Sequence, residues 1–263
     1  MRINILILVL LTVLIMPVYG KEGSSEIKIS KITPDEILQL VENRDIGDTS
    51  LGDMEMILKS GNADKRRRLK MFRNKKNNDN QNLFIHFLSP ADIKNTTYLV
   101  IENDRKKKKW MYLSSFKKRR KIVSKDNNTS FVSSDFTYED LETVHADEYK
   151  CSDLKEELAG KEEVYVFTAR KIDQSTTAYS KLIFTVAKSN NIPLIVEMFS
   201  KNNEEHVKTL TAEKIKDVDG ISTPFITKIV DLKNGSSTEL KVKKIEYNLK
   251  LPQDTFTTRN MEK

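Results

Sequence analysis

Cysteine is almost missing from this sequence. Among its 263 residues there is one, Cys151, so no intramolecular disulfide is possible. A lone thiol could be reactive, or it could bridge two copies of the chain. Because free cysteine is among the most buried residue types, we favour a third interpretation, a small apolar side chain buried in a strand.

Histidine and catalytic motifs are also scarce. The three histidines, His86, His145 and His206, are too scattered for a metal-ligand motif, so we predict neither a metal site nor a cofactor. The sequence contains no G-x-S-x-G, phosphate loop, H-E-x-x-H or CxxC. His145 lies two residues before Asp147. The two could form a base with its orienting carboxylate, but we favour the interpretation that they are a solvated pair in a loop. We predict no catalytic residue, although a triad can assemble from distant residues.

Long apolar runs are confined to the N-terminus. Arg2, the apolar run Ile5–Ile15 and the small-residue pattern ending at Gly20 are typical of a secretory signal that is cleaved after Gly20. The run is shorter than the roughly 20 residues that a membrane anchor needs, and no cysteine follows it for lipidation. We therefore expect an exported protein, and the resemblance described below implies that it is periplasmic. No linker or internal repeat divides residues 21–263, which predicts a single domain.

Charge of one sign does not dominate, but basic residues gather in runs. The 45 basic and 38 acidic residues give a net charge of +7, and three runs stand out, Lys65–Lys70, Arg105–Lys109 and Lys117–Lys121. An exported protein is an implausible partner for nucleic acid. We favour a solvated sheet edge, where lysines discourage aggregation. The alternative is contact with an anionic membrane surface or an acidic partner. The candidate contact residues are Lys117, Lys118, Arg119 and Arg120.

One helix start is clearly marked. Thr33 is the expected N-cap, Pro34 follows at the first helical position, and Glu36 completes a capping box. Ile32 and Ile37 fit the two places of a hydrophobic staple. The apolar residues between 37 and 41 form one stripe of a short amphipathic helix, which we expect to end by residue 43.

Nearly everything after this helix is strand-like. The expected strands contain Met54 to Leu58, Arg68 to Phe72, Leu83 to Leu88, Tyr98 to Ile101, Val164 to Ala169, Ala178 to Ala187, Ile192 to Phe199, Val207 to Ile215, Phe225 to Leu232 and Thr238 to Tyr247. Hairpin turns are expected at Asn190-Asn191, Asn202-Asn203, Asp219-Gly220 and Asn234-Gly235, because these residues tolerate positive φ. The pattern predicts long antiparallel strands.

The last strand changes phase. Leu240 and Val242 share one face, whereas Ile245 and Tyr247 have the opposite parity, so we expect a bulge near Lys243-Lys244. A bulge bends its strand. We therefore predict a mainly β fold with few helices, in which a strongly curved antiparallel sheet forms an open half-barrel capped by helices.

The stretch from Trp110 to Leu141 organises these elements. It is expected to open as a strand, turn through Lys117–Lys121, and end in a helical turn that Thr137 and Asp140 cap. Its aromatic residues can cover one open side of a sheet. Strands such as Leu83–Leu88 are apolar on both faces, which is equally consistent with a filled core and with a ligand cavity.

The same stretch carries a family resemblance. Trp110–Leu113, Ser134–Leu141, Phe87–Lys94 and the C-terminal Leu251–Thr257 resemble the outer-membrane lipoprotein-sorting family, relatives of the LolA and LolB carriers. The resemblance spans nearly all of the mature chain. Two positions depart from the family pattern. Ser114 stands where the family has Pro after the Leu, and Val132 stands in the region where the family has Gly before Ser-Asp.

The resemblance implies a carrier without catalysis. It implies a LolA-like half-barrel that holds lipid or lipoprotein acyl chains in a hydrophobic cavity for transfer toward the outer membrane, with a resistance-nodulation-division-type inner-membrane transporter as a plausible partner. Our candidate cavity residues are Met54, Met56, Phe87, Trp110, Tyr112, Phe131 and Phe136. Two alternatives stay open, an exported lipid hydrolase and an envelope-binding module without a ligand.

Overall fold

A single α-helix precedes the sheet in the part of the chain that the computed structural model describes, residues 31–61 and 63–263. Helix α1 (Pro34–Asn43) begins and ends where its capping signals predict. The Thr33 backbone N–H donates to Glu36 Oε2 at 2.7 Å, and the Glu36 N–H donates to Thr33 Oγ1 at 3.3 Å. Residues Ile32–Lys263 form one compact unit. The predicted signal, residues 1–20, lies outside the described residues.

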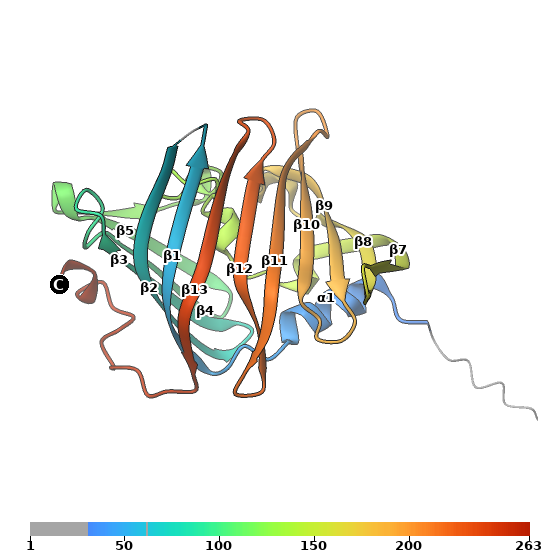
Figure 1. Cartoon of the computed structure of the whole chain (residues 1–263), viewed down its shortest axis with the longest axis horizontal. Coiled ribbons are helices and arrows are strands. Elements are labelled where there is room, and N and C mark those ends of the chain that lie inside the picture. The colour runs from blue at the N-terminus through green and yellow to red at the C-terminus, as the bar shows by residue number, and fades with distance from the viewer. Residues whose placement is uncertain (1–30, 62) are drawn as a thin grey trace, which may run out of the picture. The chain divides into compact units, whose positions relative to one another are not determined.

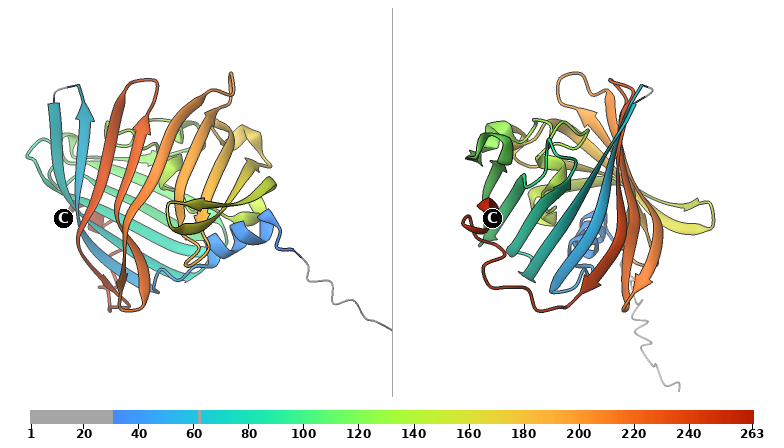
Figure 2. Two further views of the ribbon diagram at one scale, coloured as in Figure 1. Left: turned by 45° about the vertical axis from the view of Figure 1, so that its right-hand side comes forward. Right: turned by 60° about the vertical axis from the view of Figure 1, so that its left-hand side comes forward.

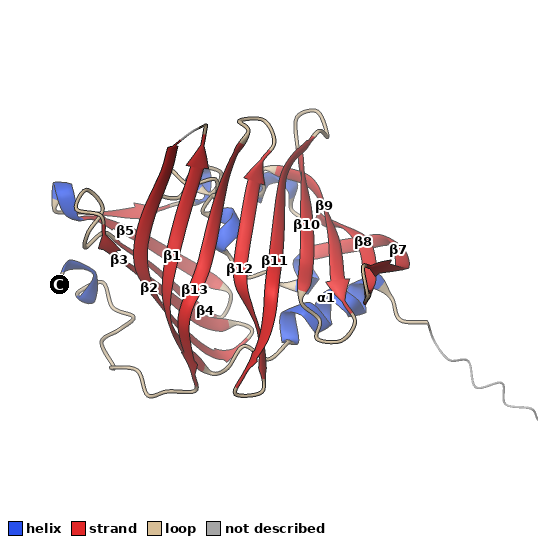
Figure 3. Cartoon of the chain, viewed as in Figure 1, coloured by secondary structure: helices blue, strands red, loops and turns tan. Residues whose placement is uncertain are grey.

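Thirteen antiparallel strands make one sheet (Figure 3). They are β1 (Thr49–Ser60), β2 (Ala63–Asn77), β3 (Asn80–Ser89), β4 (Thr97–Asn103), β5 (Lys106–Leu113), β6 (Lys118–Ile122), β7 (Tyr149–Ala159), β8 (Glu162–Lys171), β9 (Tyr179–Ala187), β10 (Pro193–Ser200), β11 (His206–Val218), β12 (Ile221–Asp231) and β13 (Ser236–Tyr247). Their order is β6-β5-β4-β3-β2-β1-β13-β12-β11-β10-β9-β8-β7. The expected mainly β architecture is confirmed.

The strand order explains the covering segment, residues 123–148. β6 and β7 are the two edges of the sheet, yet they follow one another in the chain. The covering segment must therefore cross from one edge to the other, and it carries the short helical turns η3 (Glu139–Leu141) and η4 (Ala146–Glu148). Figures 1 and 2 show the sheet curving around this segment and around α1, with its edges unjoined. The predicted open half-barrel is confirmed.

The curvature has a local cause in β13. Val242 pairs with Met54 and Lys244 with Asp53, which leaves Lys243 as an unpaired extra residue. This is the bulge that the phase change predicts, and a bulge increases the bend and twist of its strand. The Asp219-Gly220 turn joins β11 to β12 with φ of 53° and 83°, as a tight hairpin between twisted strands requires.

The covering segment is fixed to the sheet by the Ser-Asp-Phe motif of its middle. The Asp135 N–H donates to Thr238 Oγ1 at 3.0 Å, and the Thr238 hydroxyl donates to Asp135 Oδ2 at 2.6 Å. Thr238 lies on β13, so the segment is tied to the centre of the sheet. Phe131 and Phe136 beside this motif are buried, with exposed fractions of 0% and 3%. These two aromatic residues of the covering segment are therefore part of the core.

A second, smaller core lies on the other face of the sheet. Side chains alternate along each strand, so Ile85 and Phe87 face α1 and the covering segment, whereas Phe84 faces away. The outward cluster contains Phe84, Leu99 and Met261, with Phe72, Ile101, Trp110, Tyr112 and Phe256 packed against it. The C-terminal segment, which ends in the short turn η6 (Asn260–Glu262), covers this cluster. This cover explains why β3 and β4 are apolar on both faces.

Two parts of the fold differ from expectation. The basic run Lys117–Lys121, expected as a turn, is mostly the edge strand β6, paired with β5 alone. The edge strand β7 was not expected at all, because most of its side chains are half or fully exposed and show no regular alternation.

None of the described helices is long and apolar enough to cross a membrane.

Candidate ligand cavity

A cavity of about 330 Å³ lies between the concave face of the sheet, the end of α1 and η3. We call it the apolar cavity, because most of its wall is aliphatic or aromatic. These wall residues are Val41, Ile46, Leu83, Val100, Leu141, Val144, Tyr149, Tyr179, Leu182, Phe184, Pro193, Val196, Met198 and Leu210. Binding sites for small ligands commonly measure roughly 300–1,000 Å³. The volume therefore suits a single short chain rather than a bulky group.

The acidic residues along the cavity already have partners. Glu142 accepts hydrogen bonds from Lys107 Nζ, at 3.2 Å, and from Lys109 Nζ. Burial alone would raise the pKa of Glu142, but the two lysines hold it below its ordinary value. Asp140 accepts from the Tyr179 hydroxyl at 2.8 Å. These carboxylates are thus fixed in place by groups of the chain itself.

A second, polar cavity of about 630 Å³ adjoins this ion-paired wall. We call it the polar cavity. Its lining is Arg105, Lys107, Lys109, Lys121, Ile122, Val123, Ser124, Asn127, Glu142, Asp147, Glu148, Lys171, Ile172, Asp173 and Thr176. Lys107 and Glu142 line both cavities. Their ion pair is therefore part of the partition between the two spaces.

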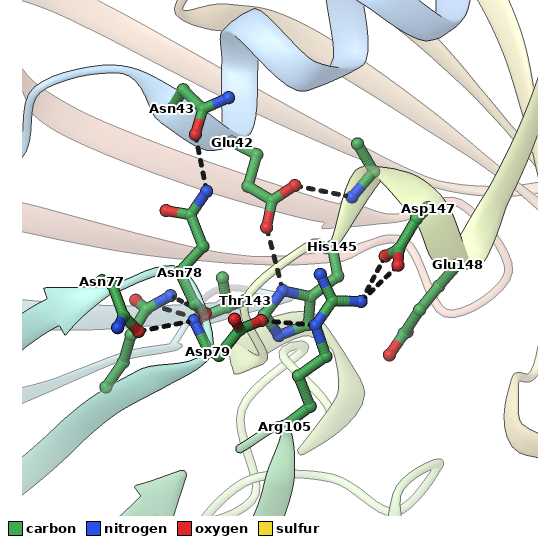
Figure 4. A network of polar contacts seen from close by, with 12 residues as sticks. Glu42, Asn43, Asn77, Asn78, Asp79, Arg105, Thr143, His145, Asp147 and Glu148 are labelled. Carbon is green, nitrogen blue, oxygen red and sulfur yellow. Dashed lines mark hydrogen bonds and ion pairs between the residues drawn. The ribbon is translucent and has the colours of Figure 1, made fainter. Parts of the chain in front are cut away.

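His145 is buried between two carboxylates, as Figure 4 shows for Glu42. Its Nδ1 lies 3.0 Å from Glu42 Oε1, and its Nε2 lies 2.8 Å from Glu102 Oε1. The hydrogen bond to Glu102, followed by that to Glu42, raises the pKa of His145 against the effect of burial. An imidazolium donates to both carboxylates at once.

Asp147 has a different partner, so both interpretations of a His145–Asp147 pair are wrong. Figure 4 shows Arg105 between Asp147 and Asp79, bonded to each. In the same network Asn78 Nδ2 donates to Asn43 Oδ1 at 2.6 Å. The network joins the end of α1 to the β2–β3 turn and to η4, which fixes one end of the apolar cavity.

Comparison with known proteins shows a matching family and a shared fold. A family model described as "Uncharacterized protein" matches residues 79–263. A structure from Vibrio parahaemolyticus, assigned as an outer membrane lipoprotein-sorting protein domain, is 26% identical, with a TM-score of 0.81 over 87% of this chain and 98% of that one. A LolA superfamily protein from Nitrosomonas europaea is 19% identical, with a TM-score of 0.67 over 88% of this chain and 100% of that one. The chain belongs to the family of that model, and it has a LolA-like fold.

A third structure has the same fold. A DUF1329 family protein from Desulfovibrio piger is 23% identical, with a TM-score of 0.81 over 86% of this chain and 97% of that one. No curated protein matches the sequence significantly. The likeness to lipoprotein-sorting proteins supports a carrier-like role for this LolA-like chain.

The seven predicted cavity residues do not line the apolar cavity of the LolA-like fold. Met56, Phe87, Phe131 and Phe136 are buried in the concave core, and Met54 is half-buried against it. Trp110 and Tyr112 lie on the opposite face, under the C-terminal segment. Grouping them with Phe131 and Phe136 is therefore wrong, because strand alternation sends Met111 and Leu113, not Trp110 and Tyr112, toward the concave side.

The actual lining could be found only in part from the sequence. Leu182 and Phe184 on β9, and Val196 and Met198 on β10, follow the period of two that marks one face of a strand. No pattern in the sequence distinguishes these residues from ordinary core. The basic residues Arg44, Arg73 and Lys75 also line the cavity. The sequence does not indicate that these three residues line a cavity, because they come together from the end of α1 and from β2 only in the folded chain.

The basic candidates have separate roles. Arg119 Nη1 donates to Glu262 Oε1 and to the Thr258 carbonyl, both at 3.0 Å, and so holds the C-terminal segment. Arg120 lies near Tyr138 of the covering segment, and its charge opposes the rise that burial gives the pKa of this tyrosine. Lys117 and Lys118 are exposed. Of the four predicted residues, Lys117 and Lys118 alone make no such side-chain contact within the described part of the chain.

Cys151 is buried in β7, with 8% exposed, as the favoured interpretation predicts. Burial, with Asp35 nearby, raises the pKa of its thiol to about 12, so the thiolate form is strongly disfavoured.

Residues 31–61 and 63–263 contain no group of three or more His, Cys, Asp or Glu side chains that could hold a metal ion.

Proposed function

We propose that this LolA-like protein is a periplasmic, non-catalytic carrier that binds a lipid or lipoprotein acyl chain in the apolar cavity. The observation that carries the proposal is the cavity itself, walled by strands β3, β4 and β9–β11 and closed by η3. An acyl chain gains about 0.8 kcal/mol for each methylene that it buries away from water. The similarity to lipoprotein-sorting structures supports the same role.

A lipid hydrolase would need an activated nucleophile. His145 lies beside the cavity wall, but both of its ring nitrogens are engaged by carboxylates. Such an imidazolium has no free nitrogen to take a proton from a serine. Nothing in this arrangement favours the hydrolase over the carrier.

The proposal is tested by filling the cavity. Leu210 lines the cavity, so Leu210→Trp should displace a bound acyl chain. Thr211→Trp is the matched control, because the next residue of β11 points to the opposite face. Native mass spectrometry of purified protein should show lipid on the wild type and on Thr211→Trp, and much less on Leu210→Trp. Lipid on none of the three, even after incubation with phospholipid, would contradict the carrier function.

A separate proposal concerns contact of this protein with a membrane or a transporter. Lys117 and Lys118 are exposed at the start of the edge strand β6, where an anionic surface could reach them. The double variant Lys117→Glu/Lys118→Glu should reduce binding to anionic vesicles, and added salt should do the same. Arg119 and Arg120 should be left intact, because they contact Glu262 and Tyr138. The resistance-nodulation-division-type transporter rests on the resemblance alone.

A further inference from the structure

Three cationic side chains share one end of the apolar cavity. Arg44 follows the last turn of α1, and Arg73 and Lys75 lie two residues apart on β2, so their side chains point to the same face. All three line the cavity, and all three are half-buried. They meet the same apolar wall that includes Val41, Ile46 and Leu83.

These cations lack the partners that buried charges usually have. Arg44 Nη1 donates to the Val41 carbonyl at 3.0 Å, and Lys75 Nζ donates to the Glu42 carbonyl at 3.3 Å. The Arg73 guanidinium makes no hydrogen bond within residues 31–61 and 63–263. No carboxylate in this part of the chain lies within 4.0 Å of the charged nitrogens of the three.

Two of the nearby carboxylates, those of Glu42 and Glu142, bind other groups. Glu42 binds His145 and the Ala146 N–H, the latter at 2.9 Å. Glu142 binds Lys107 and Lys109 on the far wall. Burial and the charge of Arg73 lower the pKa of Arg44 to about 10, and burial, then Arg44, lowers the pKa of Lys75. Glu42 and Asp45 lie close enough to raise the pKa of Lys75, but neither forms an ion pair with it, so this end of the cavity keeps an excess of positive charge.

We propose that Arg44, Arg73 and Lys75 bind the anionic head group, a carboxylate or phosphate, of a single-chain amphiphile whose tail lies along the apolar wall. Arginine offers a planar fork of donors that fits either group in a bidentate manner. The volume of about 330 Å³ suits a tail of one chain. This inference rests on the proposed function, because it assigns the head group of the same ligand.

The test compares four probes by titration calorimetry: dodecanoate, dodecyl phosphate, uncharged dodecanol and inorganic phosphate. The wild type should bind both anionic amphiphiles at least about tenfold more tightly than dodecanol, as expected for charge-assisted hydrogen bonds. Inorganic phosphate should bind more weakly than dodecyl phosphate. The ratio of dodecanoate to dodecyl phosphate then distinguishes a fatty acid from a phosphate-bearing lipid.

Variants identify the residues. Arg73→Met and Arg44→Gln should each lose about tenfold or more in affinity for the anionic amphiphiles, with dodecanol binding unchanged, and Arg73→Lys should lose less. Arg68→Met is the control, because Arg68 lies on the same strand and is exposed. Binding of dodecanol to each variant shows that the cavity is still folded.

Three outcomes would overturn the proposal. Equal binding of dodecanol and dodecanoate would refute the head-group site and leave the carrier function standing. Binding of inorganic phosphate as tight as that of dodecyl phosphate would assign a site for a free anion. Failure of every chain-bearing probe would contradict both the head-group site and the carrier function.

Discussion

Among the buried aromatic residues that the structure describes, Tyr98 alone has an unsatisfied polar atom. Its side chain is fully buried against Phe131 and Tyr138, and its hydroxyl has no hydrogen-bond partner among the described residues. An unpaired buried polar group costs about 1–3 kcal/mol. We expect Tyr98→Phe to leave the free energy of unfolding unchanged or to raise it by about 1 kcal/mol, as measured by urea denaturation.

Tyr179→Phe is the matched control. Tyr179 is also buried, but its hydroxyl donates to Asp140 at 2.8 Å. Losing a hydrogen bond to a charged group should lower the free energy of unfolding by about 1.5–3 kcal/mol. Equal losses in the two variants would mean that the Tyr98 hydroxyl has a partner after all.

His145 makes a pH-dependent contribution to stability. Its pKa is raised in the folded state by Glu102 and Glu42, above the ordinary value of 6.5. The charge of Lys107 on β5 lowers this pKa, but by less than the two carboxylates raise it. A raised pKa stabilises the fold fully below the unfolded value, and this stabilisation is lost as the pH rises through the folded value.

We therefore expect His145→Gln to lower the melting temperature most at pH 6, and by less at pH 9. Breaking a buried ion pair costs about 3–5 kcal/mol, which sets the scale at the lower pH. Thermal denaturation of wild type and variant across this range gives the difference. A difference that grows with pH would contradict the imidazolium.

At the scale of elements, the turn between α1 and β1 depends on Gly47. Its φ is +70°, and an added Cβ would lie 2.9 Å from Tyr247 Cδ1 of β13. Gly160 has a similar φ of +68°, but an added Cβ there would meet nothing within 4 Å. Gly160→Ala should therefore cost only the backbone strain, about 1 kcal/mol, and Gly47→Ala should cost clearly more.

Chemical denaturation of the two glycine variants measures this difference. The comparison isolates the contact with Tyr247, because the backbone conformation is nearly the same at both positions. Equal losses of stability would show that Tyr247 moves aside, and the turn would then tolerate a side chain.

Elements with strong local signals were predictable from the sequence. The Thr33 capping box, the Asp219-Gly220 turn and the bulge at Lys243 each depend on a few neighbouring residues. The edge strands β6 and β7 were not predictable, because a strand paired on one side needs little apolar alternation. The lining of the cavity depends on how α1 and the covering segment pack on the sheet. That packing is a property of the folded chain.

At the scale of the whole molecule, the C-terminal segment completes the outer face of the sheet. Met261 is fully buried against Phe84 and Leu99, and Trp110, the single tryptophan, packs on the same cluster. Met261→Ala should lower the free energy of unfolding by about 2–5 kcal/mol. It should also move the Trp110 emission to longer wavelength, because water reaches the cluster.

Glu262→Gln separates packing from charge. It removes the exposed ion pair with Arg119 and keeps the buried methionine. Exposed pairs contribute only about 0–1 kcal/mol, so both stability and emission should stay near the wild type. An unchanged emission in Met261→Ala would show that the segment does not cover Trp110.

The strand order has a consequence for the time course of folding. Every strand pairing joins chain neighbours except that of β1 with β13, where Asp48 and Asn248, 200 positions apart, are hydrogen-bonded. Local hairpins form quickly, whereas closing so long a loop carries an entropic cost that must be met first. Pulse-labelled hydrogen exchange during refolding should therefore protect the β9–β10 hairpin before β1 and β13. The middle of the finished sheet is the last part to form.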